Sequence, residues 1–142
     1  MLRRWLLLLA ALSAAAVAPG QALEANAQSP IPAGPPLTGH AAKDSPPARA
    51  FAALLQVVSK GDFPSIRAAL TSDHPGLGML NPEGLRLIKA ELLPNGAAPA
   101  TVMATLASVY AGHAQATLVF GVEPSLTIWK MRRQSDGWKL SP

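Results

Sequence analysis

Residues that commonly carry out chemistry in enzymes are sparse in this chain of 142 residues. It has three histidines, His40, His74 and His113, and none lies one helical turn from another metal ligand. The chain contains no cysteine, and no nearby Asp or Glu completes a ligand set, so the sequence predicts neither a metal site nor a cofactor. The serines lie in no nucleophile-elbow or triad pattern, and there is no glycine-rich phosphate loop.

Asp73 and His74 are adjacent in the sequence. A carboxylate beside an imidazole can act in general acid–base catalysis. The same two residues precede Pro75-Gly76, and a residue before proline is pushed out of the α region. We therefore favour the second interpretation, in which Asp73 and His74 lie at the solvated end of a helix.

A group of large apolar side chains near the C-terminus is the candidate ligand-binding site. Its members are Phe120, Trp129, Met131 and Trp138. Such residues can line a pocket for a small apolar ligand, and they can equally form the core of a small domain. The core is the favoured interpretation, and Trp138 in particular is expected to be buried.

The charged residues are few and predominantly basic. Twelve Lys plus Arg against eight Asp plus Glu give a net charge of +4, without the basic surface that nucleic acids require. Lys130, Arg132 and Lys139 form a basic stripe that could contact anionic lipid or polysaccharide. A solvated face is the simpler interpretation.

The N-terminus has the three parts of an export signal. Arg3-Arg4 precede an apolar run from Trp5 to Ala18, and Ala25-Asn26-Ala27 is a cleavage site of the A-x-A type. Gly20-Gln21-Ala22 is a second candidate cleavage site. The run is shorter than the roughly 20 residues that span a bilayer, so we expect a cleaved signal over residues 1–27 and no stable membrane insertion. The sequence thus predicts a periplasmic or secreted protein.

Residues 28–46 are rich in proline and are expected to form a disordered linker ahead of one domain over residues 47–142. A helix should begin at Ser45 and end at Gly61, with Phe51, Leu54, Leu55 and Val58 on its apolar side. Asp62 should cap a second helix that buries Phe63, Ile66 and Leu70 and ends at Asp73-His74-Pro75-Gly76. Periodicity leaves residues 85–93 open between helix and strand.

The C-terminal half is expected to form two hairpins. Strands over Thr101–Ala111 and Ala114–Val122 would join at Gly112-His113, so that Ala111 pairs with Ala114. Strand alternation then places one set on the core face: Met103, Thr105, Val109, Leu118, Phe120 and Val122. It places an uncharged set on the other face: Val102, Leu106, Ser108, Tyr110, Gln115, Thr117 and Val119. That second face is expected to be covered by a second copy of the chain or by a loop of the same chain.

The second hairpin is expected at Asp136-Gly137, between strands Leu126–Ser135 and Trp138–Leu140. Pairing of Ser135 with Trp138 sends Trp129, Met131, Trp138 and Leu140 to one side. The basic stripe falls on the other side, and this segregation supports the assignment of faces.

The order of two short helices and a meander ending in Asp136-Gly137-Trp138-Lys139-Leu140 resembles the nuclear transport factor 2-like (SnoaL-like, cystatin-like cone) superfamily. Ser59-Lys60-Gly61-Asp62-Phe63, followed by Ile66 and Leu70, is similar to the start of its second helix. Gly84-Leu85 through Asn95-Gly96 to Ala100-Thr101-Val102 is similar to exported bacterial members of uncharacterised function, which favours a strand over Leu85–Leu93. The resemblance covers roughly residues 47–141.

The resemblance implies a curved antiparallel sheet that wraps helices around an apolar pocket. Some members are isomerases, cyclases or dehydratases, and others are binding or dimerisation modules. The steroid-isomerase-like members place a carboxylate base and a tyrosine or acid donor in the cone. Residues 101–122 contain no Asp or Glu, so no catalytic position carries over.

The sequence therefore predicts an α+β domain with short N-terminal helices packed on a curved, cone-like antiparallel sheet. Its expected role is that of an exported, non-catalytic binding or accessory domain, with a small apolar ligand and a homodimer through the sheet face as candidate partners. The alternative is a small isomerase- or cyclase-like enzyme acting on a hydrophobic substrate.

Overall fold

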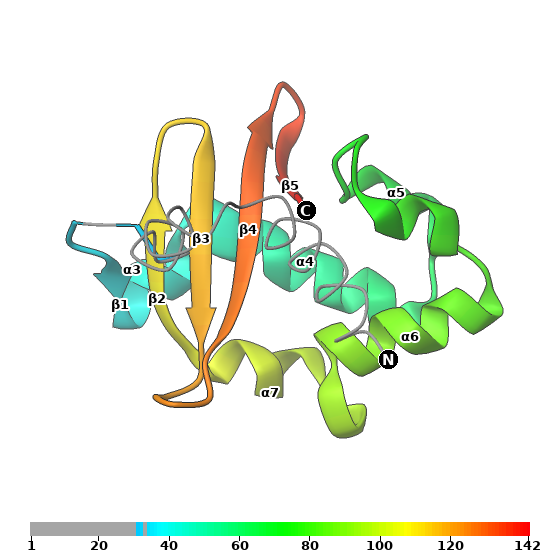
Figure 1. The fold of residues 1–142 in the computed structure, drawn as a ribbon, viewed down its shortest axis with the longest axis horizontal. Coiled ribbons are helices and arrows are strands. Elements are labelled where there is room, and N and C mark those ends of the chain that lie inside the picture. The colour runs from blue at the N-terminus through cyan, green and yellow to red at the C-terminus, as the bar shows by residue number, and fades with distance from the viewer. Residues whose placement is uncertain (1–30, 33) are drawn as a thin grey trace, which may run out of the picture.

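The computed structural model describes residues 31, 32 and 34–142, and the expected signal over 1–27 lies outside them. The described part confirms the α+β class, with helices packed on an open antiparallel sheet in the order β1-β2-β3-β4-β5 (Figure 1). Its strands are β1 (Leu37–Thr38), β2 (Leu106–Ala111), β3 (Gln115–Phe120), β4 (Thr127–Gln134) and β5 (Gly137–Leu140). Its helices are α3 (Gly39–Asp44), α4 (Pro46–Lys60), α5 (Phe63–Ala68), α6 (Pro82–Leu92) and α7 (Pro99–Ala104), with 3-10 turns η1 (Pro75–Met79) and η2 (Pro94–Gly96).

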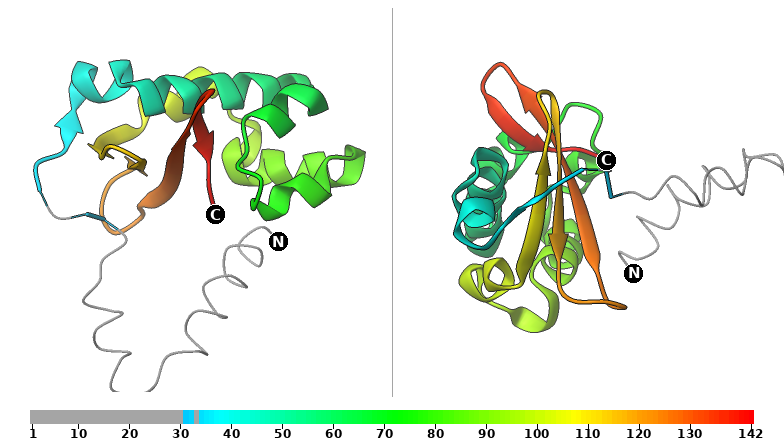
Figure 2. Two further views of the ribbon diagram at one scale, coloured as in Figure 1. Left: turned by 90° about the horizontal axis from the view of Figure 1, so that it is seen from above. Right: turned by 90° about the vertical axis from the view of Figure 1, so that its left-hand side faces the viewer.

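The helices lie on one face of the sheet and beyond one of its edges. α4 runs across the sheet, with α3 at the β1–β2 side, and α5 and α6 extend past β5 (Figures 1 and 2). We call the face toward α4 the inner face and the opposite face the outer face. The space between α4, the inner face and α6 contains the core and the candidate site.

α4 forms where the sequence predicts it. Ser45 is its N-cap, Pro46 its first residue, and Gly61 its C-cap in the left-handed region at φ 70°. The four residues of the predicted apolar stripe are all buried: Phe51, Leu54, Leu55 and Val58. The Phe51 ring lies between Phe120 and Trp129 of the sheet, with ring centroids 5.2 Å and 6.1 Å away. α4 therefore fixes the two aromatic side chains of the candidate site.

The second helix begins as predicted and ends earlier. Asp62 caps α5 by accepting a hydrogen bond from the Ser65 N–H at 3.3 Å. The helix ends at Ala68 rather than at Asp73, because Leu70 leaves it to form a parallel bridge with Leu140 of β5. Pairing with the sheet edge thus overrides the local preference for helix.

The preference for a strand over residues 85–93 is wrong. All of them except the C-cap Leu93 lie in α6, whose N-cap Asn81 accepts a hydrogen bond from the Gly84 N–H at 2.8 Å. Ile88 and Leu92 are buried on the helical stripe. The cap and the proline that follows it decide the structure where the apolar spacing could not.

The strand expected over Thr101–Ala111 is wrong in its first half. Residues Pro99–Ala104 form α7, and β2 begins only at Leu106. Proline at the first helical position favours this short helix over the β-branched composition of the segment. As a result Met103 is half-buried on α7 and Thr105 is exposed, instead of both lying on the core face of a strand.

The β2–β3 hairpin keeps the predicted faces with a different register. Ala111 pairs with Ala116 rather than with Ala114, and the Gly112 N–H donates to the Gln115 carbonyl at 2.8 Å. A shift of two residues leaves alternation unchanged, so Val109, Leu118 and Phe120 are buried on the inner face as predicted.

Two residues at the ends of this hairpin depart from the predicted faces. A register irregularity between Leu106 and Ser108 turns Leu106 to the inner face and into the core. Val122, expected in the core, follows the end of β3 and is 77% exposed.

The β4–β5 hairpin behaves in the same way. Gln134 pairs with Gly137 and Arg133 with Trp138, so the turn is Ser135-Asp136 rather than Asp136-Gly137. Trp129, Met131 and Leu140 are buried, and the basic stripe faces outward as predicted. Trp138 is only half-buried against the core, because it lies next to the turn on the edge strand β5, opposite the exposed Arg133. The prediction of a fully buried Trp138 is wrong.

The disordered linker predicted over residues 28–46 is wrong from Leu37 onward. β1 pairs with β2 through Leu37 and Val109, and α3 follows at once. Ala42 is fully buried and the Ser45 hydroxyl donates to the Ala42 carbonyl at 2.6 Å. Burial of Ala42 and strand pairing at Leu37 supply the interactions that a disordered linker would lack.

Candidate ligand-binding site

Two of the four predicted pocket residues meet at one cavity. Phe120, at the end of β3, and Trp129 of β4 both line a cavity of about 170 Å³. The rest of its wall comes from α6, η2, α7 and their flanking residues: Glu91, Leu92, Pro94, Ala97, Thr101, Val102 and Thr105, with Thr127 of β4. We call this the outer cavity, because the second cavity described below lies deeper. Despite this name, it lies on the inner face of the sheet and not on the outer face. It lies where α7 and the end of α6 approach the inner face of the sheet.

Apolar carbon dominates the wall, and the aromatic part of it is rigid. Phe120 and Trp129 are 4% and 7% exposed, so each shows only a small part of its ring to the outer cavity. Both rings pack against Phe51 of α4. A cavity preformed in this way binds an apolar ligand without first ordering its own side chains.

A few polar groups interrupt the apolar wall. Glu91 of α6 is half-buried, and Thr101, Thr105 and Thr127 are exposed at the rim. The Thr105 hydroxyl donates to the Val102 carbonyl at 2.7 Å. A small number of polar groups in an apolar wall is typical of a site that orients a small ligand.

A second, smaller cavity lies deeper, on the other side of the same residues. This inner cavity measures about 20 Å³, which is room for about one water molecule. Glu91, Leu92 and Trp129 line both cavities. Its remaining wall is formed by Leu54, Ile66, Leu70, His74, Gly76, Ile88 and Leu140.

His74 is part of this inner wall and is not solvated. It is 6% exposed, and its Nδ1 accepts a hydrogen bond from the Gly76 N–H at 2.9 Å. Burial lowers the pKa of His74 from 6.5 to about 4, and the nearby Asp73 charge opposes this only in part. The imidazole is therefore neutral at pH 7, and the favoured interpretation of a solvated helix end is wrong for His74.

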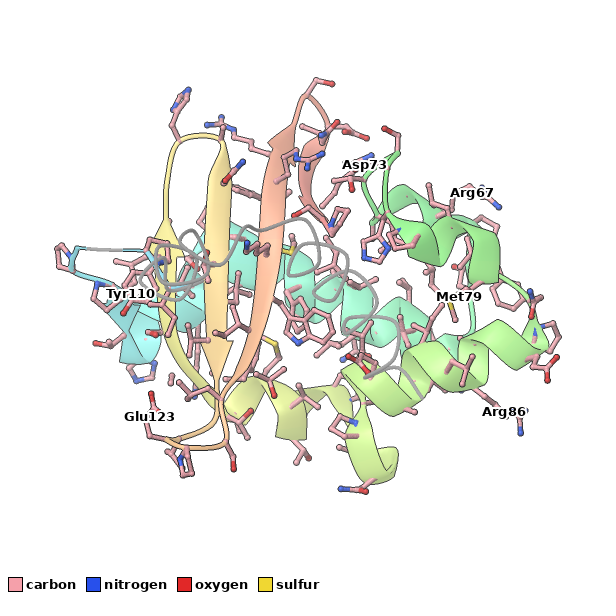
Figure 3. The ribbon with its side chains drawn as sticks, viewed as in Figure 1. Arg67, Asp73, Met79, Arg86, Tyr110 and Glu123 are labelled. Atoms are coloured by element: carbon pink, nitrogen blue, oxygen red, sulfur yellow. The ribbon has the colours of Figure 1, made fainter. Side chains whose placement is uncertain are left out.

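Asp73 faces away from this cavity and toward the sheet. Arg132 Nη1 donates to both carboxylate oxygens of Asp73, at 3.1 Å and 3.2 Å, across 59 positions of sequence. Figure 3 shows Asp73 on the turn after α5, beside the β4–β5 hairpin. The pKa of Asp73 lies below its ordinary value; the Thr71 side chain contributes most to this lowering, and Arg132 contributes less. The pair with Arg132 joins the α5–η1 segment to β4.

The acid–base chemistry open to the inner cavity comes from Glu91 and His74 rather than from Asp73 and His74. A carboxylate and a neutral imidazole on one apolar wall can accept and return a proton. Glu91 was missed because residues 85–93 were expected to form a strand. On a helix, its place between Ile88 and Leu92 would have shown a carboxylate bordering the apolar stripe.

The other two predicted pocket residues lie elsewhere. Met131 is 1% exposed in the core and lines neither of these cavities. Trp138 lies on β5 and also lines neither. The predicted group of large apolar side chains thus divides into two cavity residues and two residues that lie in the core and at its margin.

Within the described residues no group of three or more His, Cys, Asp or Glu side chains could hold a metal ion. Among those same residues, no helix has both the length and the apolar character needed to cross a bilayer. Comparisons with models of protein families, with curated proteins and with solved structures found no match to this chain.

Proposed function

We propose that this chain is a non-catalytic binding or accessory domain whose outer cavity takes a small apolar ligand. The observation that carries the proposal is the outer cavity itself, about 170 Å³, walled by Phe120 and Trp129 and mostly apolar. An apolar cavity of about 150 Å³ is enough to bind benzene. The expected ligand is therefore about the size of one ring.

The place of action in this proposal is the periplasm or the outside of the cell. Its support is the order of basic residues, apolar run and A-x-A site in the first 27 residues. Membership of the nuclear transport factor 2-like superfamily is part of the same proposal. The helices followed by a meander support it, while the helix α6, where the resemblance implied a strand, departs from it.

An enzyme acting on a hydrophobic substrate is the second candidate. Glu91 borders both cavities, and His74 shares the inner one with it. A substrate in the outer cavity would then meet the Glu91 carboxylate, with the neutral His74 behind it. Recovery of a chemically unchanged ligand after prolonged incubation distinguishes the binding function from this alternative.

A homodimer through the outer face remains a prediction. Tyr110 and Ser108 are half-buried there, whereas Thr117 and Val119 are 6% and 4% exposed within a single chain. Pro32, Gly34 and Pro35 lie beside Tyr110 and Thr117. The chain's own N-terminal segment thus borders part of the face that a second copy would need.

Native mass spectrometry of the protein purified from its own host tests the ligand proposal. We expect a small apolar molecule to co-purify, and we expect Thr101→Trp to abolish its retention by filling the outer cavity. Ala104→Trp is the matched control, because Ala104 is also an exposed residue of α7 but does not line the cavity. If both variants retain the molecule equally, the ligand binds elsewhere.

A further inference from the structure

Two cavities with polar groups in their walls adjoin on the outer face of the sheet, away from the candidate site. Their volumes are about 280 Å³ and 270 Å³. Gln115 and Thr117 of β3 line both, and Pro32 also borders both. Each volume is near the lower end of the range of about 300–1,000 Å³ for small-molecule sites.

The strand register brings hydrogen-bonding groups together at these cavities. Tyr110, Thr117 and Lys130 are successive cross-strand partners on β2, β3 and β4. Gln115 and Arg132 form the neighbouring pair on β3 and β4. Cross-strand partners have Cβ atoms about 5 Å apart, so a phenol, a hydroxyl, an amide and two cations lie within reach of one small molecule.

The charges at these cavities are only partly balanced by acidic side chains, because Asp73 pairs with Arg132. No Asp or Glu is among the described residues that line either cavity. Lys130 is exposed and, in the part of the chain that the structure describes, forms no ion pair. Within the described residues, Arg132 binds Asp73 through Nη1 alone. Its other guanidinium nitrogens can therefore donate to a further acceptor.

We propose that this face binds a small hydroxylated molecule through a phosphate or carboxylate group. Lys130 and Arg132 would hold the anionic group, since ammonium and guanidinium are the usual donors to such oxygens. Thr117, Gln115 and Tyr110 would bind the hydroxyl groups of the remainder. The site lies on the opposite side of the sheet from the outer cavity, so the proposal is independent of the apolar ligand.

Isothermal titration calorimetry on the purified protein, with glucose 6-phosphate and glucuronate as probes, tests this proposal. At least one of the two should bind, while uncharged glucose should not. Lys130→Gln should weaken binding about tenfold or more, as expected when a charge-assisted hydrogen bond is lost. Gln115→Glu, an isosteric change at an exposed position, should abolish binding by placing a negative charge between the two cavities.

Lys60→Gln is the matched control, because it removes the same charge from an exposed position at the end of α4. It should leave the affinity unchanged. The proposal is overturned if neither probe binds at millimolar concentration, or if Lys130→Gln and Lys60→Gln weaken binding equally. Binding to phosphatidylglycerol vesicles without binding to either probe would also overturn it, in favour of a basic surface that adheres to membranes.

Discussion

His74 makes the inner cavity sensitive to pH at the scale of a single residue. The imidazole is buried, and its Nδ1 is occupied as an acceptor from the Gly76 N–H. Protonation of that nitrogen would break the bond and place a charge in an apolar wall. The folded protein therefore holds its proton less tightly at His74 than the unfolded chain does.

Stability should fall as the pH is lowered from about 6.5 to about 4. The pKa of His74 is about 4 in the folded state and 6.5 by its ordinary value, so within this window the unfolded chain binds more protons. The free energy of unfolding should drop by roughly 3 kcal/mol across the window. Urea denaturation at several pH values measures this. The lowered pKa values of Asp73 and Asp136 begin to affect stability only below about pH 5, so the upper part of the window reports on His74.

The control for this prediction is a second histidine. His74→Gln should flatten the dependence on pH, whereas His113→Gln, at an exposed turn position, should leave it unchanged. An equal slope in all three proteins would show that His74 is not the responsible group.

At the scale of elements, the contact between η1 and α6 depends on Gly84. A Cβ atom added at Gly84 would collide with the main chain of Met79, including its carbonyl oxygen. Gly84 also donates the N–H that Asn81 accepts at the start of α6. The close approach of these two main chains sets the position of α6, and hence of Glu91, against the sheet.

Gly84→Ala should therefore destabilise the protein by about 1–3 kcal/mol, as overpacking does, despite the better helix propensity of alanine. Gly78→Ala is the control, because nothing lies within 4 Å of a Cβ added there. Thermal unfolding followed by circular dichroism compares the two. A Gly84→Ala variant as stable as Gly78→Ala would mean that η1 and α6 do not meet as described.

Elements with caps and long apolar stripes could be predicted from the sequence, and short apolar segments could not. Ser45 and Gly61 define α4, and alternation along β3 and β4 places Phe120 and Trp129 on the inner face. Both hairpins differ from prediction by two residues of register, an error that alternation cannot reveal because it leaves the faces unchanged. Periodicity is ambiguous over so few residues and left 85–93 open between helix and strand, and the resemblance then favoured the wrong structure. The strand over Thr101–Ala111 was predicted from composition, and its first half forms α7 instead.

That misassignment determined which site residues were found. Phe120 and Trp129 could be predicted because they lie on strands. Glu91 and Thr101 lie on α6 and α7, which pack against the sheet only in the folded chain. The cavities arise from this packing, which no local pattern in the sequence records.

At the scale of the whole molecule, the open sheet separates two environments. Its inner face is covered by α4 and α7 (Figure 2). That face carries Phe120 and Trp129 and borders both apolar cavities. Its outer face carries the basic stripe and the two cavities that have polar groups in their walls. One layer of strands thus separates the proposed apolar site from the proposed site for an anionic molecule.

The most direct test of the proposed apolar site is the response of the two tryptophans within the described residues to a small aromatic ligand. Trp129 lines both apolar cavities, whereas Trp138 lines neither. In a titration with benzene followed by ¹⁵N–¹H NMR, the indole N–H signal of Trp129 should shift to saturation. The Trp138 signal should stay in place. If neither signal moves, or if both move in parallel, the outer cavity is not a binding site and the proposed function is wrong.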